Sequence, residues 1–277
     1  MSVENLFNTK TMEELSLQKK CFLSDTKKIL KFEPEIDVEE IPVTKELYDK
    51  FFPKDDNVDY RNLRLSNIGS YSIAHPKIAS MLAKQISEDM KSTDITVTDA
   101  FGNMGGMSIA FASKFKQVNT CEIVPLHCDI LKNNLKQYKL EDKVNLQCVD
   151  YMDVMKKLKQ DVIVFDPPWG GTDYKKEKHL KLGINNVNII CIINELAGKA
   201  KFIYMMVPPN YSFSDLRMLS PEYSICMKKL EPERGDNSKL ILRIAYHKSL
   251  KGGNKTRRRR NNEKALSISN RSRSRRN

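Results

Sequence analysis

The stretch that decides the fold of this chain reads ITVTDAFGNMGG at residues 95–106. Its first four residues are β-branched, which is typical of a strand. Its second half places glycine at positions 102, 105 and 106, with Asn103 between them, and both residue types tolerate the positive φ of a tight turn. The stretch therefore predicts a strand that ends at Asp99 and a glycine-rich turn that leads into a helix.

Strands and helices of similar length continue to alternate toward the C-terminus. This alternation predicts a mostly parallel, doubly wound α/β sheet with helices on both faces. We expect further strands at residues 117–123, 144–148, 161–165, 202–207, 223–230 and 240–247, and helices at residues 125–138, 151–158 and 188–197. Ligands bind such sheets beyond the carboxyl ends of the strands, so the residues after each strand are the candidates for a site.

The regions that flank this domain have a different composition. Residues 1–43 are predicted to be a partly ordered lead-in, residues 44–92 a helical extension, and residues 93–250 the main domain. Residues 251–277 are mainly Gly, Asn, Ser and Arg and are predicted to be disordered. This tail holds eleven cations and one acid, so it carries +10 of the net charge of +12. The sequence leaves three interpretations of the tail open: a tether to the RNA backbone, a nuclear-import signal, or a solvated and dispensable extension.

Composition excludes several classes of protein. Hydrophobic residues make up 40% of the chain, enough for a sizeable core, and no stretch approaches the roughly 18 uninterrupted apolar residues of a membrane span. The N-terminus lacks the pattern of a secretory signal. The six cysteines lack the close spacing of a disulfide scaffold or a zinc knuckle, so we expect buried reduced thiols. The expectation is a soluble, intracellular monomer without a metal or a membrane partner, in the nucleus or, if viral, in host cytoplasm.

Three acids follow three successive predicted strands. Asp99 ends the first strand, Glu122 comes about 20 residues after the turn, where an acid can accept both ribose hydroxyls, and Asp150 follows the third, where it can accept an adenine amine. Any one of them could be a helix N-cap. Together they predict a site for a nucleoside cofactor, and the glycine spacing differs from the G-x-G-x-x-G of NAD-binding turns.

The fourth strand runs into the motif Asp166-Pro167-Pro168-Trp169. Two prolines fix φ and stiffen the turn that presents the Asp166 carboxylate. An exocyclic amine of a base is a poor nucleophile, and acceptors aimed at its hydrogens direct its lone pair toward an electrophilic methyl group. A tryptophan beside those acceptors fixes the plane of the base by stacking. A structural Pro-Pro turn over a buried tryptophan is the alternative.

The motif carries a resemblance to a known family. [D/N/S]-P-P-[Y/F/W] is the hallmark of amino-methyltransferases, and FDPPWGGTDY at residues 165–174 resembles the trimethylguanosine synthases, which methylate the N2 amine of the 7-methylguanosine cap of RNA. DAF followed by GG at residues 99–106, NN at residues 133–134 and GSYSI at residues 69–73 resemble further motifs of that family. The resemblance covers roughly residues 50–248.

The resemblance implies a Rossmann-like class I methyltransferase with a seven-stranded sheet, S-adenosylmethionine as cofactor and capped RNA as partner. It implies catalytic roles for Asp166, Pro167 and Trp169. The implied cofactor-binding residues are Asp99, Phe101, Gly102, Gly105, Glu122, Asp150 and Asp166, and the implied cap-binding residues are Trp169, Tyr174, Arg61, Arg64 and Asn210. A cationic 7-methylguanine would gain roughly 0.5–2 kcal/mol by stacking on the Trp169 indole.

The chain departs from the family pattern at three places. Ser70 replaces a tryptophan, Asn103 replaces a glycine, and Val207-Pro208-Pro209-Asn210 replaces a Leu-Pro-Arg-Asn turn. The third change removes an arginine expected to bind phosphate, for which Lys54, Arg61 or a residue of the tail could substitute.

Two alternative functions stay open from the sequence. The first is another amino-methyltransferase, acting on adenine N6 of DNA or guanine N2 of ribosomal RNA. The second is a cap- or RNA-binding module without catalysis, which the retained acids disfavour. The Lys-, Asn- and Ile-rich composition suggests an AT-rich genome such as that of a protist or a large DNA virus.

Overall fold

A computed structural model describes residues 21, 38–231 and 239–247, with the side chains of residues 171–173 excepted. Its centre is a seven-stranded sheet in the order β10-β11-β9-β6-β3-β4-β5. The strands are β3 (Thr96–Asp99), β4 (Gln117–Cys121), β5 (Val144–Gln147), β6 (Val162–Phe165), β9 (Phe202–Val207), β10 (Tyr223–Leu230) and β11 (Lys239–Tyr246). All neighbours pair in parallel except β11, which is antiparallel to both β9 and β10.

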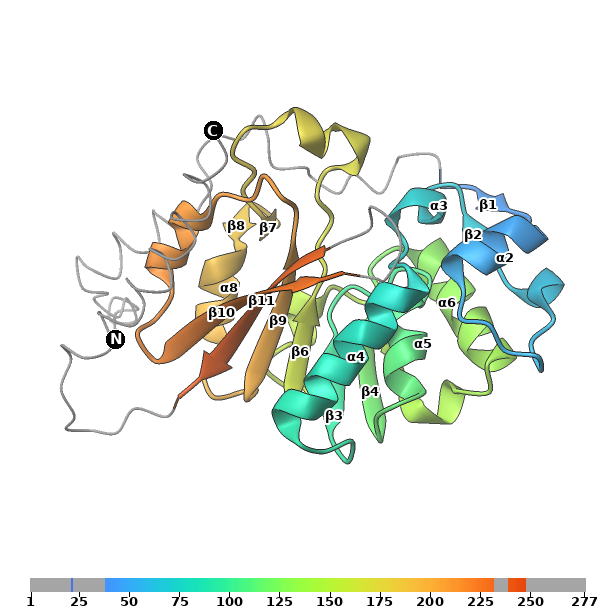
Figure 1. The fold of residues 1–277 in the computed structure, drawn as a ribbon, viewed down its shortest axis with the longest axis horizontal. Helices are drawn as coiled ribbons and strands as arrows, with labels where there is room; N and C mark the ends of the chain where they lie inside the picture. Colours follow the sequence, from blue (N-terminus) through green and yellow to red (C-terminus); the bar gives the residue numbers. More distant parts are fainter. Residues whose placement is uncertain (1–20, 22–37, 232–238, 248–277) are drawn as a thin grey trace, which may run out of the picture.

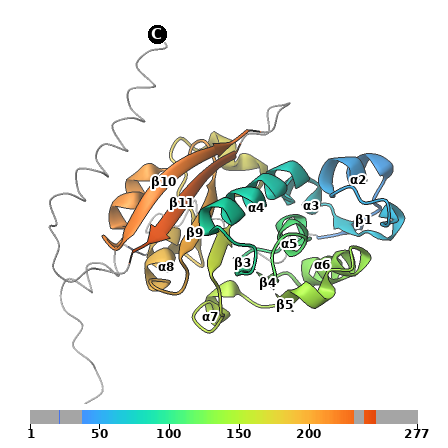
Figure 2. The ribbon, with the colours of Figure 1, turned by 60° about the horizontal axis from the view of Figure 1, so that its bottom comes forward.

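Helices cover both faces of this sheet. The helices α4 (Pro76–Met90), α5 (Gly106–Ala112) and α6 (Pro125–Gln137) lie on one face (Figure 1). Their apolar side chains are buried in one core with those of the sheet. The short α7 (Tyr151–Val154) and α8 (Ile189–Glu195) cover the other face, and Figure 2 shows α4 and α8 on opposite sides of β9 to β11. The fold is therefore the doubly wound α/β sheet that the sequence predicts.

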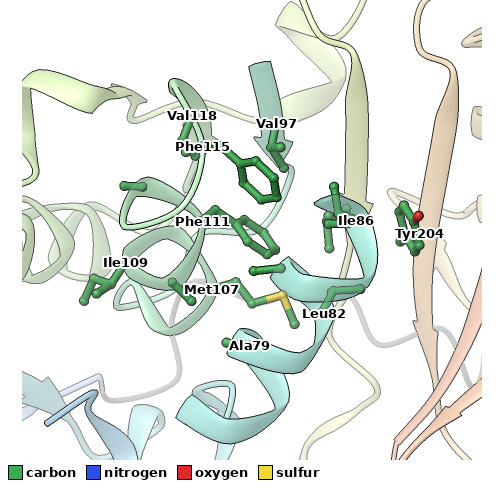
Figure 3. Close-up of a cluster of buried hydrophobic side chains, with 14 of the residues drawn as sticks. Ala79, Leu82, Ile86, Val97, Met107, Ile109, Phe111, Phe115, Val118 and Tyr204 are labelled. Carbon is green, nitrogen blue, oxygen red and sulfur yellow. The ribbon is translucent and has the colours of Figure 1, made fainter. Parts of the chain in front are cut away.

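The largest of the three hydrophobic cores among the described residues joins α4 and α5 to the middle of the sheet. Leu82 and Ile86 of α4 meet Phe111 of α5 and Val97 of β3, all fully buried (Figure 3). Burying side chains of this size contributes roughly 1.5–3 kcal/mol each. The extension before residue 93 thus contributes a helix to the core of the main domain.

The rest of the N-terminal extension packs beside α6. It contains α2 (Lys45–Phe51), the single turn η1 (Tyr60–Asn62) and α3 (Gly69–Ser72). A small two-stranded antiparallel sheet of β1 (Glu40–Ile41) and β2 (Leu65–Ser66), which the sequence did not predict, lies with them. Asn134 on α6 holds this region, because its side-chain oxygen accepts from the Arg64 amide (2.9 Å) and its amide group donates to the carbonyls of Arg64 and Met104 (3.0 Å each). The Asn133-Asn134 pair noted in the sequence therefore has a structural role here.

Element boundaries differ from the predictions for local reasons. The predicted helix at 188–197 begins at Ile189, because the Asn188 side chain caps it by accepting from the Ile190 amide (2.9 Å). The strand predicted to reach residue 123 ends at Cys121, since the Glu122 carboxylate accepts from the Val124 amide (2.8 Å) and turns the chain toward α6. The predicted lead-in before residue 38, apart from Cys21, and the predicted basic tail lie outside the described residues.

The prediction of reduced cysteines is wrong for four of the six. Cys21 is bonded to Cys191 and Cys128 to Cys148, while Cys121 and Cys226 are free thiols. The paired residues are 170 and 20 positions apart in the sequence, so the fold rather than local spacing brings them together. Among the described residues, no helix is both long and apolar enough to cross a membrane.

The core predicts a large effect of truncating Phe111. Phe111→Ala removes a fully buried ring from the contact between α5 and the sheet, and we expect it to lower the free energy of unfolding by about 3–5 kcal/mol. Chemical denaturation followed by circular dichroism measures this change. Lys114→Ala, an exposed position just beyond the same helix, is the control and should change stability by less than about 0.5 kcal/mol.

Candidate functional site

The candidate site lies at the point where the strand order reverses. The chain runs from β3 outward through β4 and β5, and then returns to β6 on the other side of β3. Asp99 is the last residue of β3 and Asp166 follows β6, and the two strand ends are joined by a bond from the Ala100 amide to the Val164 carbonyl (3.0 Å). In open α/β sheets this crevice is where ligands bind.

The glycine-rich turn after β3 is packed tightly on its own protein. Gly105 has a φ of +100° and Asn103 a φ of +48°, which explains why glycine and asparagine stand there. A Cβ on Gly105 would lie 2.7 Å from Leu131 Cδ1, and one on Gly106 would lie 2.7 Å from the Ala74 carbonyl oxygen. Backbone conformation at Gly105 and close packing at Gly106 therefore account for these glycines without a ligand.

Glu122 is the buried acid that organises this turn. One of its carboxylate oxygens accepts from the Asn103 amide (2.6 Å) and the other from the Val124 amide (2.8 Å). Burial raises the pKa of this carboxyl to about 7, and the two backbone hydrogen bonds offset part of that rise. Each carboxylate oxygen can accept a second hydrogen bond, so both remain able to receive ribose hydroxyls.

The other two predicted acids occupy different environments. Asp99 is 1% exposed and accepts from the Ser108 hydroxyl (2.6 Å), and burial raises its pKa to about 6. Asp150 caps α7 by accepting from the Met152 amide (2.9 Å). Its second oxygen accepts from the side-chain amide of Asn185 (2.9 Å). The N-cap interpretation of Asp150 is thus confirmed, and its free lone pairs still leave room for an adenine amine.

Asp166 stands at the end of β6 without a donor among the described residues. Burial raises its pKa to about 7, the Lys239 ammonium lowers it in part, and Asp99 raises it further. A carboxyl group with a pKa near neutrality can hold or accept a proton under working conditions.

Trp169 follows Asp166 in the same turn, and two of its neighbours are Tyr174 and Lys239. Its ring meets Tyr174 edge-on, with centroids 5.3 Å apart and planes at 75°. The Lys239 ammonium lies 4.8 Å from the centroid of the indole, within range of a cation–π interaction. The buried indole nitrogen has no acceptor among the described residues. Gly170 follows with a φ of +107°, which only glycine adopts without strain, and it turns the backbone away from Trp169.

Asn210 links the segment after Trp169 to the end of β9. Its side-chain amide donates to the carbonyls of Tyr174 and Glu177, both at 2.7 Å, while its side-chain oxygen is buried and unpartnered among the described residues. The structure thus brings Asp166, Trp169, Tyr174 and Asn210 to one edge of the sheet.

Arg61 and Arg64, expected to bind the cap triphosphate, belong to the N-terminal extension. There Arg61 pairs with Asp59 (2.7 Å) and Arg64 with Glu40 (2.5 Å). Both guanidinium groups are engaged by carboxylates, so a phosphate would have to displace an existing partner. Lys54, the other candidate, also has an acid beside it, Asp49 at 3.2 Å.

Sequence reasoning missed several residues of the site. Lys239 and Asn185 reach it from distant parts of the chain, and Ile123 and Val149 are exposed apolar side chains (52% and 37%) next to Glu122 and Asp150. The Asn185-Asn186 pair is detectable in principle, because two asparagines with positive φ form the turn between β7 (Gly183–Ile184) and β8 (Val187–Asn188). Nothing in the local sequence marks Lys239.

These residues fit an adenosine-containing cofactor. Exposed apolar side chains stand next to two of the acids, Ile123 after Glu122 and Val149 before Asp150, and offer a surface to an adenine ring, while Glu122 offers acceptors for the ribose. When bound, S-adenosylmethionine supplies an electrophilic methyl group on a sulfonium. The residues Asp99, Phe101, Gly102, Gly105, Glu122 and Asp150 would hold it, of which Phe101 packs on Phe165 at 5.9 Å between ring centroids.

The sheet order, the acids at three strand ends and the Asp-Pro-Pro-Trp turn define a Rossmann-like, S-adenosylmethionine-dependent methyltransferase. The sequence model of a family described as RNA cap guanine-N2 methyltransferase matches residues 95–249. This match covers more than half of the chain, and the chain belongs to that family.

Two curated relatives are similar to parts of the chain. An uncharacterized protein of Acanthamoeba polyphaga mimivirus is 31% identical over 46% of this chain and 51% of its own length. The trimethylguanosine synthase of Saccharomyces cerevisiae is 25% identical over 59% of this chain and 53% of its own length. The chain thus spans about half the length of these relatives, and the viral one agrees with the origin suggested by composition.

Solved structures with a similar fold include several methyltransferases. The tRNA m1G37 methyltransferase of M. jannaschii is 18% identical with a TM-score of 0.45, covering 68% of this chain and 55% of its own. The M. capricolum TrmK in complex with S-adenosyl-homocysteine is 14% identical with a TM-score of 0.44, covering 62% of this chain and 71% of its own.

The raised pKa of Glu122 predicts a pH-dependent affinity for the cofactor. Ribose hydroxyls donate to the ionised carboxylate, so we expect S-adenosylmethionine to bind more tightly as the pH rises through about 7, the pKa of Glu122 in the free protein. Glu122→Gln should bind more weakly and lose this part of the pH dependence. Isothermal titration calorimetry at pH values on either side of neutrality measures both effects.

Glu141→Gln is the matched control, since Glu141 is an exposed acid outside the site. An unaltered pH dependence in Glu122→Gln would assign the titration to another group and contradict the role given to Glu122.

Proposed function

We propose that this protein transfers methyl groups from S-adenosylmethionine to the N2 amine of a 7-methylguanosine RNA cap. The proposal rests on two residues that follow β6: Asp166, a hydrogen-bond acceptor, and Trp169, an aromatic ring that can bind a cation. Asp166 is without a donor among the described residues, and the adjacent Trp169 indole already has a cation, the Lys239 ammonium, 4.8 Å from its centroid. Family membership supports the same substrate.

Asp166 would orient the amine for transfer. Its carboxylate can accept a hydrogen bond from the N2 amine, which directs the nitrogen lone pair toward the methyl donor. The amine then loses a proton as its new bond to carbon forms. Asp166, with a pKa raised to about 7, can accept that proton without a large energetic cost. The preceding strand and the Pro167-Pro168 turn fix the position of this carboxylate.

Trp169 would select the methylated base. N7 methylation gives guanine a positive charge, and a cation gains roughly 0.5–2 kcal/mol on an indole face. That gain corresponds to about two- to thirtyfold in affinity. In the free protein the Lys239 ammonium lies over the Trp169 ring. The ring therefore already interacts with a positive charge where a cationic base would bind.

The direct test is methyl transfer to cap dinucleotides. The protein is incubated with S-adenosylmethionine and either a 7-methylguanosine-capped or an unmethylated-capped dinucleotide, and the products are weighed by mass spectrometry. We expect one or two added methyl groups on the methylated cap alone. Transfer to adenine in DNA or to guanine in a ribosomal RNA fragment, without transfer to either cap, would support the other amino-methyltransferases instead. Cofactor binding without any transfer would favour a binding module.

Substitutions at Asp166 and Trp169 distinguish the rate of methyl transfer from the preference for the 7-methylated cap. Asp166→Asn should lower kcat by at least about a hundredfold, because an amide cannot accept the amine proton. Trp169→Ala should lose the preference for the 7-methylated cap, while Trp169→Phe should keep part of it. The ratio of kcat/KM on the two dinucleotides measures selection, and calorimetry with S-adenosylmethionine checks that the cofactor still binds. An Asp166→Asn enzyme with full kcat would contradict the role of Asp166.

Lys239 predicts a shift in the pH profile of the reaction. Its ammonium lowers the pKa of Asp166, so Lys239→Met should move the acid limb of log kcat against pH toward higher pH. Lys239→Arg keeps the charge and should leave the limb near its original position. An acid limb that is the same in all three proteins would show that Asp166 does not govern it.

A further inference from the structure

A run of lysines follows the catalytic motif directly. Residues 174–181 read YKKEKHLK, with four lysines against one glutamate, and we name them the lysine segment. The first residue of the segment, Tyr174, is the aromatic ring that meets Trp169 edge-on at 5.3 Å. The segment therefore begins next to Trp169, the ring proposed to stack on the cap base.

The lysine segment is fastened across the chain that follows β9. Asn210 donates to the carbonyls of Tyr174 and Glu177 at 2.7 Å each. Leu180 is 4% exposed and pairs with Tyr211, and its amide and carbonyl bond to Asn210 (2.9 Å) and Ser212 (2.7 Å). Hydrogen bonds thus fix the backbone of the segment at Tyr174, Glu177 and Leu180, and this gives it a defined position beside the site.

The side chains that this arrangement leaves outward are cationic. Lys175, Lys178 and Lys181 are exposed, whereas Leu180 between them is buried. Lys175 and Lys178 have no carboxylate partner among the described residues. Lys181 reaches Asp215 at only 3.9 Å, and an exposed pair of this kind contributes about 0–1 kcal/mol. Arg61 and Arg64, by contrast, are each held by a carboxylate.

We propose that Lys175, Lys178 and Lys181 bind the phosphates of the RNA chain that follows the cap. The inference rests on the proposed function, because a cap base stacked on Trp169 brings the 5′ end of its RNA to Tyr174, where the lysine segment starts. Phosphates of a single strand are neutralised by exposed lysines with release of counterions.

The test compares two substrates in three proteins. The substrates are a 7-methylguanosine-capped dinucleotide and a capped single-stranded oligonucleotide. The proteins are the unaltered chain, the segment variant Lys175→Gln/Lys178→Gln/Lys181→Gln, and a control variant Lys114→Gln/Lys157→Gln/Lys159→Gln. The control removes the same charge from exposed lysines at the opposite edge of the sheet, where the strands β4 and β6 begin.

We expect the unaltered protein and the control to favour the oligonucleotide in kcat/KM by at least about tenfold at low salt. The segment variant should lose this preference and keep its kcat/KM on the dinucleotide. For three phosphate contacts, the slope of log affinity against log salt for the oligonucleotide should fall in magnitude by about 2. Fluorescence anisotropy of the labelled oligonucleotide measures this slope independently of catalysis.

A segment variant that keeps the oligonucleotide preference and the salt slope would overturn the inference, as would an equal loss in the control. If the unaltered protein methylates neither cap, the proposed function fails. The salt slope of oligonucleotide binding then still decides whether the lysine segment contacts phosphates.

Discussion

The site depends on one constraint, the absence of room for side chains in the turn after β3. Gly106 lies against the backbone at Ala74 and Gly105 against Leu131 of α6. The amide of Asn103 in the same turn donates to Glu122 at the end of β4. A single turn therefore fixes the N-terminal extension, α6 and Glu122 relative to one another. A side chain at Gly106 would press on the backbone at Ala74, and one at Gly105 would press on Leu131.

The acids at the strand ends show how packing and chemistry share the same residues. Glu122 turns the chain into α6 and Asp150 caps α7, yet both keep lone pairs for a ligand. Structural and binding roles are therefore compatible at each position. Since burial raises the pKa of Asp99, Glu122 and Asp166, a ligand that donates hydrogen bonds to ionised carboxylates stabilises groups that are otherwise costly to bury.

Much of the fold was predictable because its determinants are local. Alternation of strands and helices indicated the doubly wound sheet, and the stretch at 95–106 located the turn. The Asp-Pro-Pro-Trp motif located the other side of the crevice. The side chains that complete the site were not predictable in this way. Lys239 reaches Trp169 only because β11 inserts antiparallel between β9 and β10, and Asn185 reaches Asp150 only through a hairpin turn. The sequence singled out Arg61 and Arg64 for their charge and did not show that each pairs with a carboxylate.

Because α4 packs in the core, the start of the folded core and the start of the family match fall at different residues. Similarity to the methyltransferase family begins at residue 95, whereas the buried residues Leu82 and Ile86 on α4 lie before it. A fragment cut at the edge of the family match would expose the apolar face of β3 and α5 to water. The packed unit is therefore longer than the segment that the family model matches, because α4 completes the core from upstream of residue 95.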